Sequence, residues 1–276
     1  MASQLNNLIL IKSFLIGICF GSFFNVVIYR LPLELSIVRP RSFCPKCKSR
    51  ISWRENIPLL SWLIQKGKCR NCENKISISY PIIEFLTGVF FVILNFSSQQ
   101  IHSSITNEIF RNLFSWIFFS IIFLISLIDI NHFWVPQKLI NYGFLFGFIN
   151  LILVKFIVGN SNLYDLIRAF ATIIVSYLFF ELIRKIAKYI FKKEALGQGD
   201  SKLISMISVW LGPVGILLSV GISYIFAAIF VIFGLSMNIL RRNQFIPFAP
   251  FLAIGGLMVW FFGNDQIILS IYGKLM

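Results

Sequence analysis

Long apolar stretches, bounded by charged residues, proline or asparagine, dominate the pattern of the chain. Seven of them suggest membrane-spanning helices, each of which needs about 20 apolar residues. They cover residues 8–29, 80–96, 113–130, 139–158, 163–183, 214–240 and 247–262. A shorter apolar segment covers 201–211, and no charged residue occurs from Leu203 to Leu240.

The uncharged run from 203 to 240 is too long for a single span. Gly212-Pro213 is the natural place for a break, because proline lacks a backbone donor and disfavours helix in the residue before it. We therefore predict an all-α polytopic membrane protein with about eight transmembrane segments, the sixth of them short. The only sizeable module outside the membrane is the stretch 30–80.

Composition and charge support this class. Hydrophobic residues make up 57% of the chain and charged residues 13%, which excludes a soluble globular enzyme. The net charge is +14, and 20 of the 25 basic residues fall on one side of the predicted topology, eleven of them between Arg30 and Tyr80. Because basic residues near span ends stay in the cytoplasm, we expect that side to be cytoplasmic and both termini to lie outside. The charge then reflects topology, and no nucleic-acid partner is expected.

Four of the five cysteines form a C-x2-C-x21-C-x2-C pattern, made by Cys44, Cys47, Cys69 and Cys72. Each pair can supply two of the four ligands of a tetrahedral thiolate site, and the spacing is typical of a zinc ribbon. The stretch 30–80 has few large apolar side chains and buries little core, so a metal crosslink would supply free energy for its folding. We predict a structural Zn²⁺; metal-free thiols and disulfides are the alternatives. Cys19, alone in an apolar segment, is expected to be buried.

Acidic residues beside the apolar segments are candidate functional groups, because ionisable side chains are costly there. Asp129 ends a 17-residue uncharged apolar run, and Asp200 follows Gly197-Gln198-Gly199 at the start of the short sixth segment. Both are therefore expected at the same cytoplasmic edge of the membrane. Glu84 and Glu181 are also candidates, although nearby basic residues could pair with them.

A pair of carboxyls within hydrogen-bonding range suits peptide hydrolysis, because the two do not both ionise readily. The charged member takes a proton from the attacking water, while the protonated member polarises the scissile carbonyl and then serves the leaving amine. The two glycines before Asp200 permit unusual dihedrals and a close backbone approach. Structural roles stay open: Asp200 could be a helix N-cap, and Asp129 could pair with Lys138 or Lys202.

Eight stretches of the chain match the motifs of one known family. They are residues 21–32 (GSFFNVVIYRLP), 42–45 (SFCP), 56–62 (NIPLLSW), 67–70 (GKCR), 80–84 (YPIIE), 127–130 (LIDI), 197–203 (GQGDSKL) and 247–252 (PFAPFL). Together they resemble the bifunctional type IV prepilin peptidases, GxGD-type membrane aspartyl proteases of bacteria. The resemblance covers nearly the whole chain.

This resemblance implies an activity and its residues. The family cleaves short basic leaders from type IV prepilin or pseudopilin precursors at the cytoplasmic face of the bacterial inner membrane. It then methylates the new N-terminal amine, with S-adenosylmethionine as methyl donor. Carried over to this chain, Asp129 and Asp200 would be catalytic, and Gly197, Gly199 and Lys202 would belong to the active-site loop.

The resemblance also divides the chain into a first transmembrane helix (1–29), a cytoplasmic, methyltransferase-associated cysteine domain (30–80) and a transmembrane aspartyl peptidase domain (81–276). Prepilin precursors and membrane lipid are the expected partners. No residue of the methyl-donor site follows from the motifs, and Glu84 is a candidate for substrate or methyl-donor binding.

Three positions depart from the family pattern. Gln137 replaces the acid of a Leu-Pro-Asp sequence, Asn131 replaces an acid two residues after the first aspartate, and Ala249 replaces a glycine. They are expected to affect efficiency or substrate preference more than reaction class.

Two other classes of function compete with the enzyme. In a transporter or channel, Asp129, Asp200 and Glu84 would relay ions near the middle of the bilayer. In a catalytically silent anchor, the zinc module would bind a partner and the aspartates would be dispensable. The predicted position of both aspartates at one membrane edge favours the enzyme.

Overall fold

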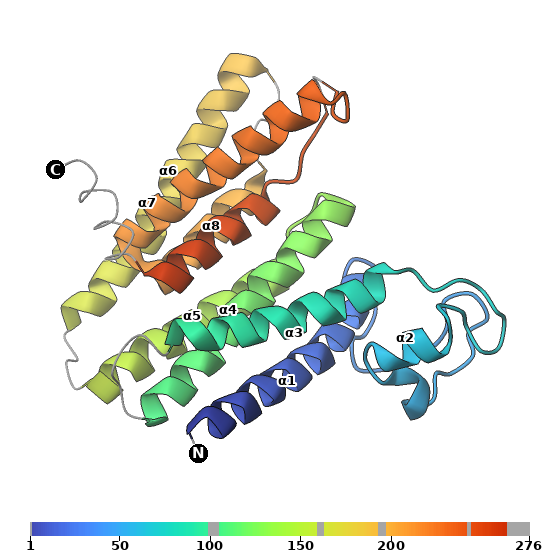
Figure 1. Ribbon diagram of the computed structural model, residues 1–276. Helices are drawn as coiled ribbons and strands as arrows, with labels where there is room; N and C mark the ends of the chain where they lie inside the picture. Colours follow the sequence, from blue (N-terminus) through green and yellow to red (C-terminus); the bar gives the residue numbers. More distant parts are fainter. Residues whose placement is uncertain (1, 99–104, 159–162, 193–196, 242–243, 264–276) are drawn as a thin grey trace. The chain divides into compact units, whose positions relative to one another are not determined.

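The structure is a computed structural model that describes residues 2–98, 105–158, 163–192, 197–241 and 244–263 (Figure 1). The described residues form helices joined by loops, with two isolated β-bridges. The elements are α1 (Ala2–Arg30), the 3-10 helix η1 (Trp53–Asn56), α2 (Leu60–Ile64), α3 (Ser79–Ser98), α4 (Ile105–His132), α5 (Gln137–Val158), α6 (Leu163–Phe191), α7 (Gln198–Ser236) and α8 (Ala249–Phe262). The predicted all-α class is confirmed for this part of the chain.

Four of these helices are long and apolar enough to cross a membrane. Their candidate spans are Leu8–Arg30, Ile109–His132, Leu166–Ile190 and Gln198–Ser236. Three shorter apolar helices cover Ser79–Asn95, Gln137–Leu153 and Ala249–Phe262. A membrane protein is therefore supported, whereas the predicted count of eight segments is not confirmed.

The break expected at Gly212-Pro213 is present inside α7. Gly212 has φ 71° and ψ −177°, so two helical pieces meet there at a kink. Left-handed φ values of this kind are readily available to glycine alone, and Pro213 lacks the N–H that would continue the helix. The predicted segments 201–211 and 214–240 thus correspond largely to the two halves of one kinked helix.

The chain divides into two compact units, Met1–Ser103 and Ser104–Met276. In the first unit, α1 and α3 pack closely because glycines lie at their crossing. A Cβ atom on Gly17 would lie 2.7 Å from Cα of Gly88, and one on Gly21 would lie 2.6 Å from Cα of Glu84. The two helices also share a hydrogen bond from the Asn25 side chain to the carbonyl of Tyr80, at 3.2 Å.

In the second unit, an aromatic cluster joins helices α4, α7 and α8. The Trp260 ring centroid lies 5.3 Å from that of Phe118 and 5.8 Å from that of Trp210. Both indole N–H groups are satisfied, one by the Ser115 hydroxyl and the other by the carbonyl of Gly143 on α5. This cluster therefore ties four helices of the unit together, and both indole N–H groups within it are paired.

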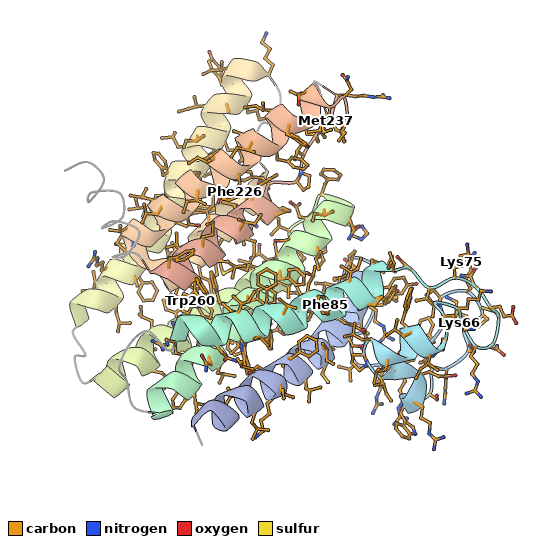
Figure 2. All side chains as sticks on the ribbon, viewed as in Figure 1. Lys66, Lys75, Phe85, Phe226, Met237 and Trp260 are labelled. Atoms are coloured by element: carbon orange, nitrogen blue, oxygen red, sulfur yellow. The ribbon has the colours of Figure 1, made fainter. Side chains whose placement is uncertain are left out.

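Large apolar side chains also cover outer helix faces in both units. Phe85 of α3 is 51% exposed and Phe226 of α7 is 38% exposed, whereas Lys66 and Lys75 belong to the loop region between α1 and α3 (Figure 2). Such apolar faces suit contact with lipid. Cys19 also lies on an exposed face of α1, so the prediction that it is buried was wrong. In a membrane helix an apolar residue can face lipid as readily as protein.

Candidate active site and metal site

The two candidate aspartates lie at helix ends in the second unit. Asp129 precedes the last residue of α4, His132, by one turn, and Asp200 is the third residue of α7. Both side chains are buried, with 5% and 8% of their surface exposed. The carboxylates are near enough for their charges to interact. The structure thus brings together two acids that are 70 residues apart in sequence.

Each carboxylate is held by a backbone N–H group. Ala249 N donates to Oδ2 of Asp129 at 3.2 Å, and Gly197 N donates to Oδ2 of Asp200 at 3.1 Å. The first donor begins α8, and the second precedes α7. Helix N-termini offer unsatisfied N–H groups and favour negative charge, so these bonds orient the carboxyls without a cation.

The structural alternatives for the aspartates have different outcomes. Asp129 does not pair with Lys202, whose ammonium donates to Oε1 of Gln137 at 2.7 Å. Among the described residues, no lysine or arginine lies within ion-pairing distance of either aspartate. Asp200 is not the N-cap of α7, but it occupies the third helical position and accepts the N–H of the N-cap residue Gly197.

The two glycines of the loop are explained by close packing. Gly197 has φ −73° and ψ 149°, an ordinary extended conformation, and Gly199 has no left-handed φ either. The expectation of unusual dihedrals was therefore wrong. A Cβ on Gly199 would lie 2.6 Å from Cβ of Val135, and one on Gly197 would lie 3.1 Å from the Asp200 carboxylate. The expected close approach of another backbone is not seen either, because the atoms nearest to both glycines belong to side chains.

The structure adds neighbours of the site that the sequence did not indicate. Tyr224, on the second half of α7, is close enough to Asp200 for an electrostatic interaction. Its ring lies 5.2 Å from that of Phe248, the residue before Ala249. The motif at 247–252 indicated that this segment matters, but it did not indicate that the backbone N–H of Ala249 donates to Asp129.

The four motif cysteines converge in the first unit. Their sulfur atoms all lie within 4.8 Å of one another, and Sγ of Cys44 is 3.9 Å from Sγ of Cys72. Four thiolates around a tetrahedral Zn²⁺, with Zn–S bonds of about 2.3 Å, would be separated by roughly 3.8 Å. The donor set and its spacing therefore fit a zinc ion. All four are free thiols, so the disulfide alternative is not supported.

The two cysteine pairs lie in loops of the same design. In the first loop, Cys44 N donates to Ser49 O and Lys48 N donates to Cys44 O, both at 2.9 Å. In the second, Cys69 N donates to Asn74 O at 2.9 Å and Glu73 N donates to Cys69 O at 2.8 Å. One isolated β-bridge closes each loop, Phe43 with Arg50 and Lys68 with Lys75. Each loop thus presents two sulfurs from one tight turn.

Hydrogen bonds prepare part of this cluster for the thiolate form. The side chain and backbone of Ser49 lower the pKa of Cys47 to about 6, and backbone N–H groups of Cys72 and Asn71 lower the pKa of Cys69. Thiolates are the form that binds metal. For Cys72, the hydrogen bond from the Asn74 backbone lowers the pKa, but burial and the neighbouring sulfurs outweigh it and raise the pKa to about 11.

The remaining candidate acids differ from each other. Glu181 forms an ion pair with Arg184 one turn later, with Arg184 Nε donating at 2.9 Å, so the structural role considered for it is confirmed. Glu84, 8% exposed at the start of α3, accepts the Leu59 N–H at 2.7 Å. It forms no ion pair with a described residue.

Comparison with known proteins agrees with the motifs. Residues 15–98 match the family model of the bacterial peptidase A24 N-terminal domain, and residues 116–232 match that of the type IV leader peptidase family. No solved structure matches the chain.

Three curated relatives illustrate the similarity. A prepilin leader peptidase/N-methyltransferase of Myxococcus xanthus is 38% identical over 208 residues, which are 74% of this chain and 58% of that protein. A type 4 prepilin-like proteins leader peptide-processing enzyme of Escherichia coli O78:H11 is 32% identical, over 87% of this chain and 89% of the relative. A prepilin leader peptidase/N-methyltransferase of Legionella pneumophila is also 32% identical, over 92% and 91%. The resemblance drawn from the motifs is confirmed, and this chain belongs to the type IV leader peptidase family.

Proposed function

We propose that this protein cleaves the leader peptides of type IV prepilin or pseudopilin precursors and then methylates the new N-terminal amine. Asp129 and Asp200 are the catalytic pair of the peptidase. The observation that carries this assignment is their placement: two buried carboxyls at helix ends interact with each other, each is held by a backbone N–H, and neither pairs with a basic side chain of the described residues. Such a pair has no evident structural role that requires both acids.

The chemistry follows from the shared charge of the pair. One carboxylate takes a proton from water as that water attacks the scissile carbonyl, and the other, protonated, donates a hydrogen bond to the carbonyl oxygen. The protonated acid then delivers its proton to the leaving amine as the C–N bond breaks. The pair titrates as a unit, so neither aspartate is assigned alone as the base. Gly197, Gly199 and Lys202 shape the loop around it.

Methyl transfer is assigned to the part of the chain that carries the cysteines. When bound, S-adenosylmethionine would supply the methyl group, and the neutral terminal amine of the cleaved product would accept it and release a proton to solvent. The division into residues 1–29, 30–80 and 81–276 assigns this step to the cysteine domain. Cys44, Cys47, Cys69 and Cys72 would hold a structural Zn²⁺ that fixes the two loops to each other.

The membrane arrangement is part of the same proposal. About eight transmembrane segments, with the kinked α7 counted as two, would place residues 30–80 and both aspartates at the cytoplasmic face of the bacterial inner membrane. The basic loops support this orientation. A precursor with an apolar helix after its cleavage point would then lie in the lipid and present its scissile bond at the aspartates. The positive charge is used for topology, with no nucleic-acid partner.

The position of the aspartates separates this proposal from a transporter. An ion relay needs charges near the middle of the bilayer, whereas Asp129 and Asp200 lie within one turn of helix ends. A silent anchor would retain its function after either aspartate is lost, which the following experiment tests.

The experiment co-expresses the chain with a prepilin precursor and follows cleavage by gel mobility and mass. We expect mature, methylated product from the native chain and from a control, Glu34→Gln, which changes an exposed acid outside the site. We expect uncleaved precursor with Asp129→Asn and with Asp200→Asn, because each loses one ionisable carboxyl. Cleavage that survives both substitutions would remove the dyad from the mechanism.

A further inference from the structure

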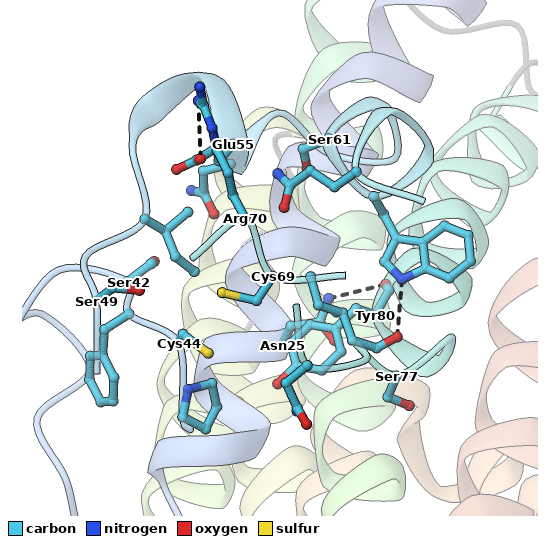
Figure 3. Close-up of a pocket in the computed structure, with 18 of the residues that line it drawn as sticks. Asn25, Ser42, Cys44, Ser49, Glu55, Ser61, Cys69, Arg70, Ser77 and Tyr80 are labelled. Carbon is cyan, nitrogen blue, oxygen red and sulfur yellow. Dashed lines mark hydrogen bonds and ion pairs between the residues drawn. The ribbon is translucent and has the colours of Figure 1, made fainter. Parts of the chain in front are cut away.

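A cavity of about 780 Å³ lies in the first unit, among the end of α1, the start of α3 and the cysteine loops (Figure 3). Its walls include Asn25 and Tyr29 of α1, Tyr80 and Glu84 of α3, and Cys44 and Cys69. Pockets for small ligands usually measure roughly 300–1,000 Å³. This cavity therefore has the size of a small-molecule site, and it belongs wholly to the unit that carries the cysteines.

The cavity is also lined by the basic residues Arg30, Lys46, Arg50, Arg70 and Lys75, but none of these forms an ion pair with its buried acid Glu84. The side chain is 8% exposed, and its polar contacts are the Leu59 N–H at 2.7 Å and the Ser22 side chain, both neutral. In the described part of the chain, no lysine or arginine lies within ion-pairing distance of it. By contrast Glu55, which also lines the cavity, pairs with Arg70 at 3.5 Å (Figure 3). A buried carboxylate without a cation is unfavourable, so a positively charged ligand would compensate it.

The backbone opposite Glu84 is held in a strained turn. Leu59 has φ 61° and ψ −52°, and the N–H of Leu60 donates to Pro58 O at 2.7 Å, which together form a γ-turn with positive φ. This turn is rare because it is strained. Strain of this kind persists only where the surroundings determine the conformation. Here the Leu59 N–H fixes one oxygen of Glu84, so the carboxylate is positioned before any ligand binds.

Aromatic side chains supply the rest of a suitable wall. Phe43, Trp62 and the tyrosines Tyr29 and Tyr80 line the cavity. Trp62 is itself held, since its Nε1 donates to Ile76 O at 3.3 Å. Aromatic faces stack against planar rings and attract cations. Together with Glu84 and the basic side chains, these aromatic walls suit a ligand that combines a flat heterocycle, a positive centre and a negatively charged group.

We infer that this cavity is the methyl-donor site and that Glu84 faces the sulfonium of S-adenosylmethionine. The inference rests on the proposed methyltransferase activity and deepens it. S-adenosylmethionine carries an adenine ring and a permanent positive charge on sulfur, and the charge disappears when the methyl group leaves. A carboxylate beside the sulfur therefore holds the donor more strongly than the product S-adenosylhomocysteine, and product release follows from the loss of charge.

The test compares the binding of these two compounds to the purified full-length protein in lipid nanodiscs. We expect the native chain to bind S-adenosylmethionine about tenfold more tightly than S-adenosylhomocysteine, because a buried charge pair is lost in the product complex. Glu84→Gln keeps an oxygen for Leu59 N–H but removes the charge. It should lose this preference while its affinity for S-adenosylhomocysteine changes by less than about threefold, which also shows that the site is folded.

Two further variants complete the comparison. Glu84→Asp keeps the charge and should retain a preference for S-adenosylmethionine, and Glu34→Gln should behave as the native chain. The inference is overturned if the native chain has no preference between the compounds, or if Glu84→Gln keeps it. It is also overturned if Glu84→Gln weakens binding of a peptide with a free N-terminal amine and leaves donor binding intact, since the cavity would then take the acceptor. If the native chain still methylates in any of these cases, the inference fails but the proposed function stands. If the native chain neither cleaves nor methylates, the proposed function itself fails.

Discussion

The backbone N–H of Ala249 donates a hydrogen bond to Oδ2 of Asp129 at 3.2 Å, across 120 residues of sequence. Ala249 is the first residue of α8, so its N–H is one of the donors that a helix leaves without an internal partner. The alanine side chain is fully buried, so a methyl group fits at the position where the family pattern of the sequence analysis has glycine. The departure at this position therefore leaves the hydrogen bond to the aspartate in place.

Removal of this donor should impair cleavage. Ala249→Pro deletes the N–H at the first position of α8. Because proline also disfavours the αR conformation of the preceding Phe248 (φ −97°, ψ −24°), the melting temperature is measured beside cleavage to show that the fold is kept. A hydrogen bond to a charged group contributes about 1.5–3 kcal/mol, so we expect the kcat/KM of leader cleavage to fall roughly 10- to 100-fold. Ala249→Gly keeps the N–H and should stay within about threefold of the native rate. Native-like cleavage by the proline variant would show that Asp129 does not need this bond.

Gly199 should tolerate no side chain. A Cβ there would lie 2.6 Å from Cβ and 2.7 Å from Cγ2 of Val135, and overpacking of this kind costs about 1–3 kcal/mol. We expect Gly199→Ala to lower cleavage about tenfold by displacing the first turn of α7, which carries Asp200. Gly221→Ala, also on α7 but with open space around its Cβ, is the matched control. Val135→Gly in the Gly199→Ala background removes the opposing atoms and should restore part of the activity; failure to do so would point to another cause.

The helices and the cysteine cluster could be predicted from local sequence. Apolar runs specify membrane helices because a span in lipid must hydrogen-bond its own backbone polar groups. Gly212-Pro213 marks a kink because the glycine permits an unusual φ and the proline lacks a backbone N–H. The C-x2-C pairs likewise carry their geometry within each turn. Cys19 could not be placed, because hydrophobicity does not distinguish a lipid-facing position from a buried one.

The contacts that orient the acids could not be predicted, because they join residues far apart in sequence. The bond from Lys202 to Gln137 spans 65 residues, and that from Ala249 to Asp129 spans 120. Neither has a local signature. The glycines before Asp200 were identified as important, but only the structure shows that the reason at Gly199 is the side chain of Val135. Glu84 was a candidate from its position in the sequence, whereas only the structure shows that no lysine or arginine of the described residues pairs with it.

The cysteine cluster should hold one metal ion. We expect about one zinc per native chain by inductively coupled plasma mass spectrometry, since four cysteines complete a tetrahedral site. Cys44→Ser and Cys69→Ser should each lose most of it, because a hydroxyl is a poor zinc ligand. Cys19→Ser changes a cysteine of α1 outside the cluster and should retain the native content. Equal zinc in all four proteins would mean that the metal binds elsewhere.

Gln137 should be a neutral replacement for the acid of the family pattern. Its Oε1 already accepts a hydrogen bond from the Lys202 ammonium at 2.7 Å, so the lysine two residues after Asp200 is held in place without a salt bridge. Gln137→Asp would convert this bond to an exposed ion pair, which contributes only about 0–1 kcal/mol. We therefore expect cleavage by Gln137→Asp to stay within about threefold of the native rate.

Lys202→Met removes the ammonium that donates to Gln137, and so tests the lysine side of this hydrogen bond. We expect a loss of about tenfold in kcat/KM, because the first turn of α7, which carries Asp200, is no longer fixed to the start of α5 and a bond to a charged donor is lost. Kinetics of a prepilin peptide in detergent would measure both variants, with Lys138→Met, an exposed neighbouring lysine, as the control. A large gain in rate from Gln137→Asp would contradict this interpretation, since it would mean that relatives use the acid for catalysis and that this chain works without it.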